Sequence, residues 1–228
     1  MTEPQIDEPA LDERPALPVS EILRRLPPLF TVSVPSRRNS GKSYLVRQLV
    51  QQLIAAKRVD ITLCMSGTSG LTKDWDFLPK GCVQPFNAEK LTRILERQRG
   101  LILEGKEVKH ILVILDDCLS TKESLRSPVI QKYYTEGRHL HVSIIVISQH
   151  TSLLLTPIIR ANTDVFLIGK LNKGQQEALW SSTVCLRKED FFKLCDTVAG
   201  DGYGFLLIDN YLQTSRRPID FLSLVKAD

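Results

Sequence analysis

The segment SRRNSGKS, residues 36–43, decides the fold. It departs at one position from the phosphate-loop pattern G-x-x-x-x-G-K-[ST], because Ser36 replaces the first glycine. Such a loop turns backbone N–H groups toward phosphates and is closed by a helix N-terminus. Lys42 is expected to neutralise the β- and γ-phosphates, Ser43 to help hold Mg²⁺, and Gly41 to let the backbone approach closely. The segment therefore predicts a nucleotide-binding loop between a strand and a helix.

The expected nucleotide contacts cover the whole loop and the residue after it: Ser36, Arg37, Arg38, Asn39, Ser40, Gly41, Lys42, Ser43 and Tyr44. The first position often needs the torsional freedom of glycine, so Ser36 leaves the affinity for nucleotide open. Arg37 and Arg38 are unusual inside such a loop. They either touch phosphate or a neighbouring molecule, or they are solvated.

On either side of the loop, the chain alternates between short apolar runs and longer helical patterns. Most of the runs are continuous and rich in Val and Ile, which is typical of strands covered on both faces and therefore of a mainly parallel sheet. Residues 43–57 repeat leucine every four positions, and Asn87 is expected to cap another helix. These patterns predict a three-layer α/β domain. The expected strands are residues 29–35, 60–65, 110–115, 142–148, 164–169 and 203–210.

Two polar strand ends supply the chemistry that a phosphate loop lacks. ILVILDDC, residues 111–118, places two carboxylates after an apolar run, in the Walker B pattern. Asp116 is expected to bind Mg²⁺ or its water, and Asp117 to polarise the attacking water. Gln149 follows the run at 142–148 and is expected to sense the γ-phosphate. The alternatives are helix-capping aspartates and a simple polar strand end.

Charge divides the chain unevenly. Residues 1–21 hold six of the 26 acidic groups and one of the 30 basic groups, which leaves 29 basic against 20 acidic groups in the remainder. We expect residues 1–27 to form an acidic, Pro-rich flexible tail, with a short helix over 20–26, and residues 28–228 to form the P-loop ATPase domain. A basic body is compatible with a phosphate-backbone partner, as it is with an ordinary solvated surface. No apolar run approaches the ~18 residues of a membrane span, and the N-terminus has no signal pattern, which favours a cytoplasm-like compartment.

Two further segments make the pattern restrictive: EGRHLHVSIIVISQ at 136–149 and PIIRANTD at 157–164. In this order, after the phosphate loop and the LDD segment, they resemble the poxvirus-type genome-packaging ATPases of the FtsK/HerA superfamily, over roughly residues 29–210. The resemblance implies a RecA-like P-loop core, a homo-oligomeric ring, and Mg²⁺-dependent ATP hydrolysis between neighbours. It also implies translocation of double-stranded DNA, a capsid or vertex protein as partner, and a place at the assembly site in the host cytoplasm or in the virion.

The resemblance makes Arg138 and Arg160 candidates for the arginine that reaches a neighbouring subunit's ATP. Arg138 stands just before the strand at 142–148, so we expect it at the end of the sheet opposite the phosphate loop. Arg160 lies between two strands, and we expect it near the end where ATP binds, as a sensor-type alternative. A surface or helix-capping role is the alternative for both.

Three other functions remain open on the sequence. Another FtsK/HerA-type translocase would usually bring a membrane anchor or extra domains. A P-loop kinase would carry a lid with clustered arginines, and strand-end Asp and Gln fit hydrolysis better. A scaffold that binds nucleotide without turnover is suggested by Ser36.

Overall fold

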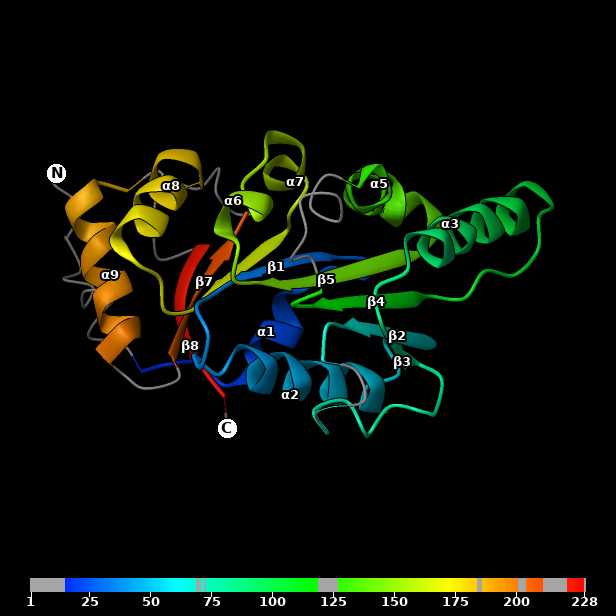
Figure 1. Cartoon of the computed structure of the whole chain (residues 1–228), viewed down its shortest axis with the longest axis horizontal. Helices are drawn as coiled ribbons and strands as arrows, with labels where there is room; N and C mark the ends of the chain where they lie inside the picture. The colour runs from blue at the N-terminus through cyan, green and yellow to red at the C-terminus, as the bar shows by residue number, and fades with distance from the viewer. Residues whose placement is uncertain are drawn as a thin grey trace, which may run out of the picture.

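The computed structural model describes residues 15–68, 71, 73–118, 127–183, 186–200, 204–210 and 221–227. Its centre is an eight-stranded sheet in the order β3-β2-β4-β5-β1-β6-β7-β8, with helices on both faces (Figure 1). The strands from β3 to β6 in this order are parallel, and β7 and β8 add to the edge in antiparallel fashion. The predicted three-layer α/β fold with a mainly parallel sheet is confirmed. The strands are β1 (Thr31–Pro35), β2 (Ile61–Ser66), β3 (Val83–Gln84), β4 (Ile111–Asp116), β5 (Val142–Ser148), β6 (Val165–Ile168), β7 (Gly204–Asp209) and β8 (Leu222–Lys226).

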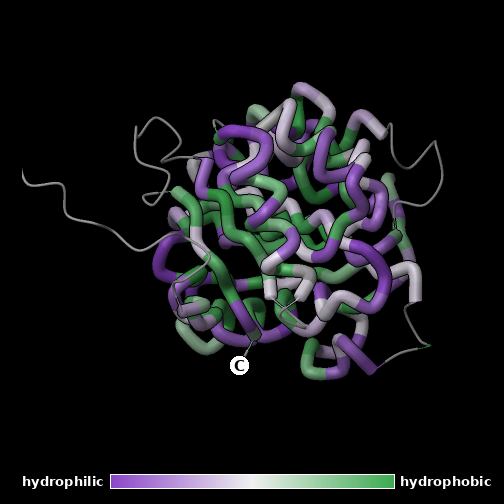
Figure 2. The backbone as a smooth tube through the Cα atoms, turned by 90° about the vertical axis from the view of Figure 1, so that its left-hand side faces the viewer, coloured by the Kyte–Doolittle hydropathy of each residue, from purple (hydrophilic) through white to green (hydrophobic). Residues whose placement is uncertain are grey.

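Three buried clusters explain why the strands read as continuous apolar runs. On one face, α1 and α2 cover side chains such as Val32 and Ile145, and on the other α3, α5 and α7 cover alternate ones such as Ile144 and Val146. Helices α8 and α9 pack against β6, β7 and β8. Figure 2 shows the hydrophobic segments running through the interior, between hydrophilic outer turns. The helices are α1 (Val19–Arg25), α2 (Lys42–Ala55), α3 (Ala88–Leu103), α5 (Pro128–Glu136), the 3-10 turn η2 (Gly137–Leu140), α6 (Thr151–Leu154), α7 (Pro157–Ala161), α8 (Lys173–Thr183) and α9 (Lys188–Gly200).

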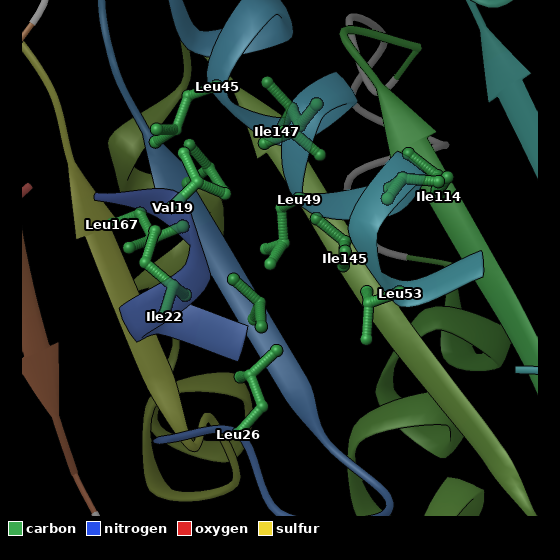
Figure 3. Packing of buried hydrophobic residues seen from close by; sticks show 14 of the residues in the cluster. Val19, Ile22, Leu26, Leu45, Leu49, Leu53, Ile114, Ile145, Ile147 and Leu167 are labelled. Carbon is green, nitrogen blue, oxygen red and sulfur yellow. The ribbon is translucent and has the colours of Figure 1, made fainter. Parts of the chain in front are cut away.

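The two helices predicted from periodicity and capping are present. The leucine repeat of α2 points Leu45, Leu49 and Leu53 at the sheet, where all three are fully buried (Figure 3). The N-terminus of α3 is capped by Asn87, whose Oδ1 accepts a 2.8 Å hydrogen bond from the Lys90 amide. Among the described residues, every helix is too short or too polar to cross a bilayer.

The N-terminal boundary of the domain was placed too far along the chain. The short predicted helix exists as α1, but Val19, Ile22 and Leu26 on it and just after it are buried in the core beside α2 (Figure 3). Leu17 also extends the sheet edge, because its amide donates to the Leu224 carbonyl at 2.8 Å. Six acidic residues and five prolines within 1–27 conceal this apolar stripe. Residues 1–14 of the expected tail lie outside the described residues.

The strand order brings the three predicted site segments together. β5 lies between β1, which precedes the phosphate loop, and β4, which carries the aspartates. The register pairs Pro35 with Ser148 and Asp116 with Ile147. Because these strands are parallel, their carboxyl ends meet at one edge of the sheet, which is where ligands bind in open α/β sheets.

Candidate nucleotide-binding site

A cavity of about 520 Å³ opens at this carboxyl edge. It is lined by residues 38–44 of the phosphate loop and first helical turn, by Asp116, Asp117 and Gln149, and by Gly67, Thr68 and Asp74 from the connection after β2. Ser36 and Arg37 do not line the cavity, although the sequence placed both among the nucleotide contacts. Most of the expected binding residues are therefore gathered around one polar space.

The loop backbone has the curvature that a phosphate cradle needs. Asn39 and Gly41 adopt left-handed torsions, with φ of 58° and 81°, and α2 starts at Lys42 directly afterwards. Gly41 has no side chain to cap the helix, and the first turn of α2 holds no acidic residue. No side chain therefore caps this end of the helix, and the positive end of the helix dipole favours an anionic ligand.

Ser36 replaces glycine without adopting a glycine conformation. Its φ lies outside the left-handed region that Asn39 and Gly41 occupy. Its side chain is fully buried and donates to the Ser40 hydroxyl, which in turn donates to the Arg37 carbonyl at 2.8 Å. The substitution therefore adds side-chain hydrogen bonds beneath the loop. It does not strain the loop backbone.

Lys42, Asp117 and Gln149 meet beside the cavity. The Lys42 ammonium lies 2.9 Å from Asp117 Oδ2, and the Gln149 side-chain amide donates to the same oxygen at 2.9 Å. Asp117 reaches this position from a left-handed backbone, with φ 47°. This corner of the cavity therefore combines three groups: a cation that can bind phosphate, a carboxylate that can accept a water proton, and an amide that can orient that water.

The neighbouring aspartate is buried and held from two sides. Asp116 accepts a 3.4 Å hydrogen bond from the Ser43 hydroxyl on Oδ1 and a 2.9 Å hydrogen bond from the Trp75 indole on Oδ2. Burial raises the pKa of Asp116, and the hydrogen bond from Trp75 opposes that rise. A hydroxyl and a carboxylate are the hard oxygen ligands that Mg²⁺ prefers, so Ser43 and Asp116 fit the metal site predicted for them.

Sequence reasoning missed Trp75 and Asp74. Both lie in the connection between β2 and β3, which follows neither a helical nor a strand pattern. Asp74 lines the cavity and lies 3.5 Å from Arg47 of α2. A single tryptophan in an irregular segment carries no motif, so no sequence signal could have placed its indole on Asp116.

The two candidate arginines lie away from this cavity. Arg138 in η2 forms a 2.7 Å ion pair with Asp164, which also accepts from the Thr31 amide at 2.7 Å. These contacts place Arg138 at the amino ends of β1, β5 and β6, opposite the phosphate loop, as predicted. Its side chain remains 43% exposed.

The position expected for Arg160 was wrong. It is not among the residues that line the cavity, because α7 carries it back toward the amino ends of the strands. There the carbonyl of Asn162, two residues on, accepts a hydrogen bond from Thr31 at the start of β1. A parallel crossover has to return the chain to that edge before β6 can begin.

Comparison with known proteins gives two viral relatives, and no family model matches the chain. One relative is uncharacterised protein 075L of Invertebrate iridescent virus 6, 25% identical over 186 residues, which covers 80% of this chain and 71% of that protein. The other is uncharacterised protein L437 of Acanthamoeba polyphaga mimivirus, also 25% identical, covering 81% of this chain and 66% of that protein.

Solved structures show the fold more clearly. The genome-packaging NTPase B204 of Sulfolobus turreted icosahedral virus 2, in complex with AMPPCP, superposes with a TM-score of 0.61 at 19% identity, over 89% of this chain and all of that one. The conjugation coupling protein TcpA of pCW3, with ATPγS, superposes with a TM-score of 0.62 at 12% identity, over 87% of this chain and 60% of that one. The chain thus has the P-loop NTPase fold of the viral genome-packaging NTPase B204, and its sequence is similar to proteins of an iridovirus and a mimivirus.

Proposed function

We propose that this chain is an ATP-hydrolysing motor that moves double-stranded DNA into a viral capsid. The observation that carries the proposal is the meeting of Lys42, Asp117 and Gln149 at the mouth of a phosphate loop, with Asp116 and Ser43 beside them. The similarity to B204, which is described as a genome-packaging NTPase, and to proteins of two other viruses supports the packaging role.

Each residue at this edge has a role in phosphoryl transfer to water. The loop amides and Lys42 bind the β- and γ-phosphates, and Ser43 and Asp116 hold Mg²⁺. Mg²⁺ held by these two residues would neutralise charge that develops on the phosphate oxygens. Asp117 accepts the proton of the attacking water, and Gln149 orients that water. Because Lys42 contacts Asp117, an arriving γ-phosphate competes for the ammonium and leaves the carboxylate free to act as a base.

The remaining parts of the motor involve more than one copy of the chain. ATP hydrolysis in a homo-oligomeric ring would use an arginine from the neighbouring subunit. Both candidates lie toward the amino ends of the strands, and Arg138 is the better placed because its side chain is the more exposed. The basic excess beyond residue 21 suits contact with a DNA backbone. We place the motor at the assembly site in the host cytoplasm or in the virion, against a capsid or vertex protein.

A second candidate function is DNA transfer between cells. The similarity in fold to TcpA, described as a conjugation coupling protein, favours it. The same site chemistry would serve both processes, so only the DNA substrate and the partner separate them. A P-loop kinase and a nucleotide-bound scaffold without turnover have no comparable support.

ATP hydrolysis measured with and without linear duplex DNA tests the proposal. We expect DNA to stimulate turnover by the intact chain, and Lys42→Ala to abolish nucleotide binding while its circular dichroism stays unchanged, because Lys42 compensates the triphosphate charge. Phosphorylation of a small acceptor would identify a kinase. Nucleotide binding without turnover would identify a scaffold. Stimulation by single-stranded DNA alone would favour transfer over packaging.

A further inference from the structure

Trp75 touches the aspartate that the proposed mechanism assigns to the metal. Its indole N–H donates to Asp116 Oδ2 at 2.9 Å, and the two residues are only 3% and 5% exposed. Water cannot easily replace the indole in so buried a contact, so the loss of this donor would leave a desolvated carboxylate oxygen without a partner. A hydrogen bond to a carboxylate is stronger than one between neutral groups, so the contact matters most when Asp116 carries its charge and binds a cation.

This contact fixes which oxygen of Asp116 faces the metal position. Oδ2 is occupied by the indole, and Oδ1 is directed at the Ser43 hydroxyl, 3.4 Å away. Ser43 and Asp116 are the two residues that the proposed mechanism uses for Mg²⁺. An indole that holds Oδ2 therefore presents Oδ1 to the shared site.

Trp75 shares its hydrophobic cluster with the helix that follows the phosphate loop. Its ring belongs to the same buried cluster as Leu49 and Leu53 of α2. The preceding residue, Asp74, lies 3.5 Å from Arg47 on that helix. The connection that carries Trp75 is thus docked on the element whose first turn holds Ser43.

The start of this connection is also tied to the aspartate strand. The Gly67 amide donates to the Asp116 carbonyl at 3.2 Å. A Cβ atom on Gly67 would lie 2.8 Å from the Asp117 carbonyl oxygen, so only glycine fits there. The connection between β2 and β3 therefore contacts Asp116 at two points, through the backbone of Gly67 and through the side chain of Trp75.

We propose that Trp75 is a positioning residue that orients Asp116 and so sets the affinity of the site for Mg²⁺. It acts through Asp116 and does not touch nucleotide. The inference rests on the proposed Mg²⁺–nucleotide site but is independent of DNA movement. Removing a partner that orients a metal ligand typically costs about 10- to 100-fold in metal affinity.

The test uses Trp75→Phe in the full chain, which keeps an aromatic ring and removes the N–H. Binding of a fluorescent non-hydrolysable ATP analogue is measured across a Mg²⁺ titration and again in EDTA. We expect the Mg²⁺ midpoint to rise about tenfold or more while affinity in EDTA stays within about twofold. Trp180→Phe is the matched control: it removes the other indole hydrogen bond, to the Leu186 carbonyl at 2.8 Å, and should not shift the midpoint.

A double-mutant cycle separates positioning from packing. If Trp75 acts through Asp116, then Trp75→Phe should change the Mg²⁺ midpoint little in an Asp116→Asn background, whereas a packing defect would persist there. An unshifted midpoint in a folded Trp75→Phe protein would overturn the inference, as would an equal loss of affinity in EDTA. A wild-type chain that binds no Mg²⁺–nucleotide would instead refute the proposed site.

A second readout does not depend on the folding of Trp75→Phe. In Trp180→Phe protein, Trp75 is the single remaining tryptophan, and its emission should change with Mg²⁺–nucleotide at the same midpoint as binding. Emission that ignores Mg²⁺ across the binding transition would overturn the inference even if Trp75→Phe fails to fold.

Discussion

A Cβ atom placed on Gly169 would lie 2.2 Å from the side-chain oxygen of Ser36, so the phosphate-loop serine fills the space that Gly169 leaves open. Gly169 follows β6, and its amide donates to the Pro35 carbonyl at 3.1 Å, just before the loop. The loop has no glycine at its first position, but a glycine directly after the adjacent strand β6 leaves room for the Ser36 side chain, which occupies that space.

This pairing predicts that Gly169→Ala distorts the phosphate loop. We expect a loss of about 1–3 kcal/mol in the free energy of unfolding from overpacking, and weaker nucleotide binding. Ser36→Gly in the same chain should restore part of both, because it removes the nearest contact and leaves the Phe205 ring at 2.8 Å. Denaturant unfolding and nucleotide titration measure the two effects.

Gly174→Ala is the control for this substitution. Its new methyl group would meet Asn172 Oδ1 at an ordinary 3.6 Å, so stability should stay within about 1 kcal/mol of the original chain. A Gly169→Ala protein as stable and as tightly bound to nucleotide as Gly174→Ala would show that the loop tolerates the methyl group.

Much of the fold and of the site could be predicted because the signals are local in the sequence. The apolar runs define buried parallel strands, and the phosphate loop and the aspartate pair each carry their chemistry within a few residues. Parallel strands then bring their carboxyl ends to one edge, which is why Asp117 and Gln149, 32 positions apart, could be expected near Lys42 and meet there.

The parts that could not be predicted depend on contacts between distant residues without a motif. Trp75 and Asp116 are 41 positions apart, and nothing around Trp75 marks its partner. The space that Gly169 leaves for Ser36 is equally invisible along the chain. At the N-terminus, the acidic, Pro-rich composition of residues 1–27 predicts a flexible tail. Val19, Ile22 and Leu26 nevertheless have the spacing of a buried helix face, and they are buried.

The two aspartates should fail in different ways. Asp117→Asn keeps the shape of the side chain but cannot accept the proton of water, so we expect Mg²⁺–ATP binding to persist and turnover to fall by about 10²–10⁴. Asp116→Asn removes charge from the metal side, and should raise the Mg²⁺ concentration needed for binding. Nucleotide titrations with and without Mg²⁺, together with single-turnover hydrolysis, distinguish them. Reversed phenotypes would exchange the two roles.

His110 should make the stability of the domain depend on pH. Its Nδ1 donates to the Arg58 carbonyl at 2.6 Å, and its Nε2 accepts from the Ser143 hydroxyl at 2.8 Å, as the neutral ring allows. Burial is the main cause that lowers the pKa of His110 below its ordinary value. The hydrogen bond to the Arg58 carbonyl and the charge of Asp60 oppose it, and the charges of Arg58 and His141 add to it. Because the folded pKa is below the unfolded one, the neutral ring contributes its full stability above about pH 6.5, and this is lost as the pH falls through the folded pKa.

Thermal unfolding at pH 7.5 and 5.5 tests this dependence. The drop in Tm between the two should be smaller in His110→Gln than in the unmodified chain, because the titrating group is gone. His139→Gln, at an exposed position on η2, should keep the drop of the unmodified chain. An equal drop in His110→Gln would show that other groups carry the acid sensitivity.

Arg138 is expected to act on the ATP of a neighbouring subunit. Its ion pair with Asp164 uses Nη2, and the guanidinium has further N–H donors on a side chain that is 43% exposed. A second cation brought to the γ-phosphate can supply roughly 10³–10⁵ in rate. Arg138→Ala should therefore lose most ATPase activity while nucleotide still binds. Unfolding measurements must accompany it, because Asp164 is buried and loses a partner.

Mixing two inactive proteins shows whether Arg138 acts in trans. Arg138→Ala chains keep Lys42, and Lys42→Ala chains keep Arg138, so a ring of both contains interfaces with one intact residue from each side. With random mixing in equal amounts, about a quarter of the interfaces are competent, and ATPase activity should recover toward that fraction. Arg160→Ala mixed with Lys42→Ala is the matched comparison, because Arg160 also lies toward the amino ends of the strands. If only the mixture that contains Arg138→Ala recovers activity, the role belongs to Arg138. If only the mixture that contains Arg160→Ala recovers activity, the role belongs to Arg160. Full activity of Arg138→Ala by itself would remove Arg138 from the mechanism.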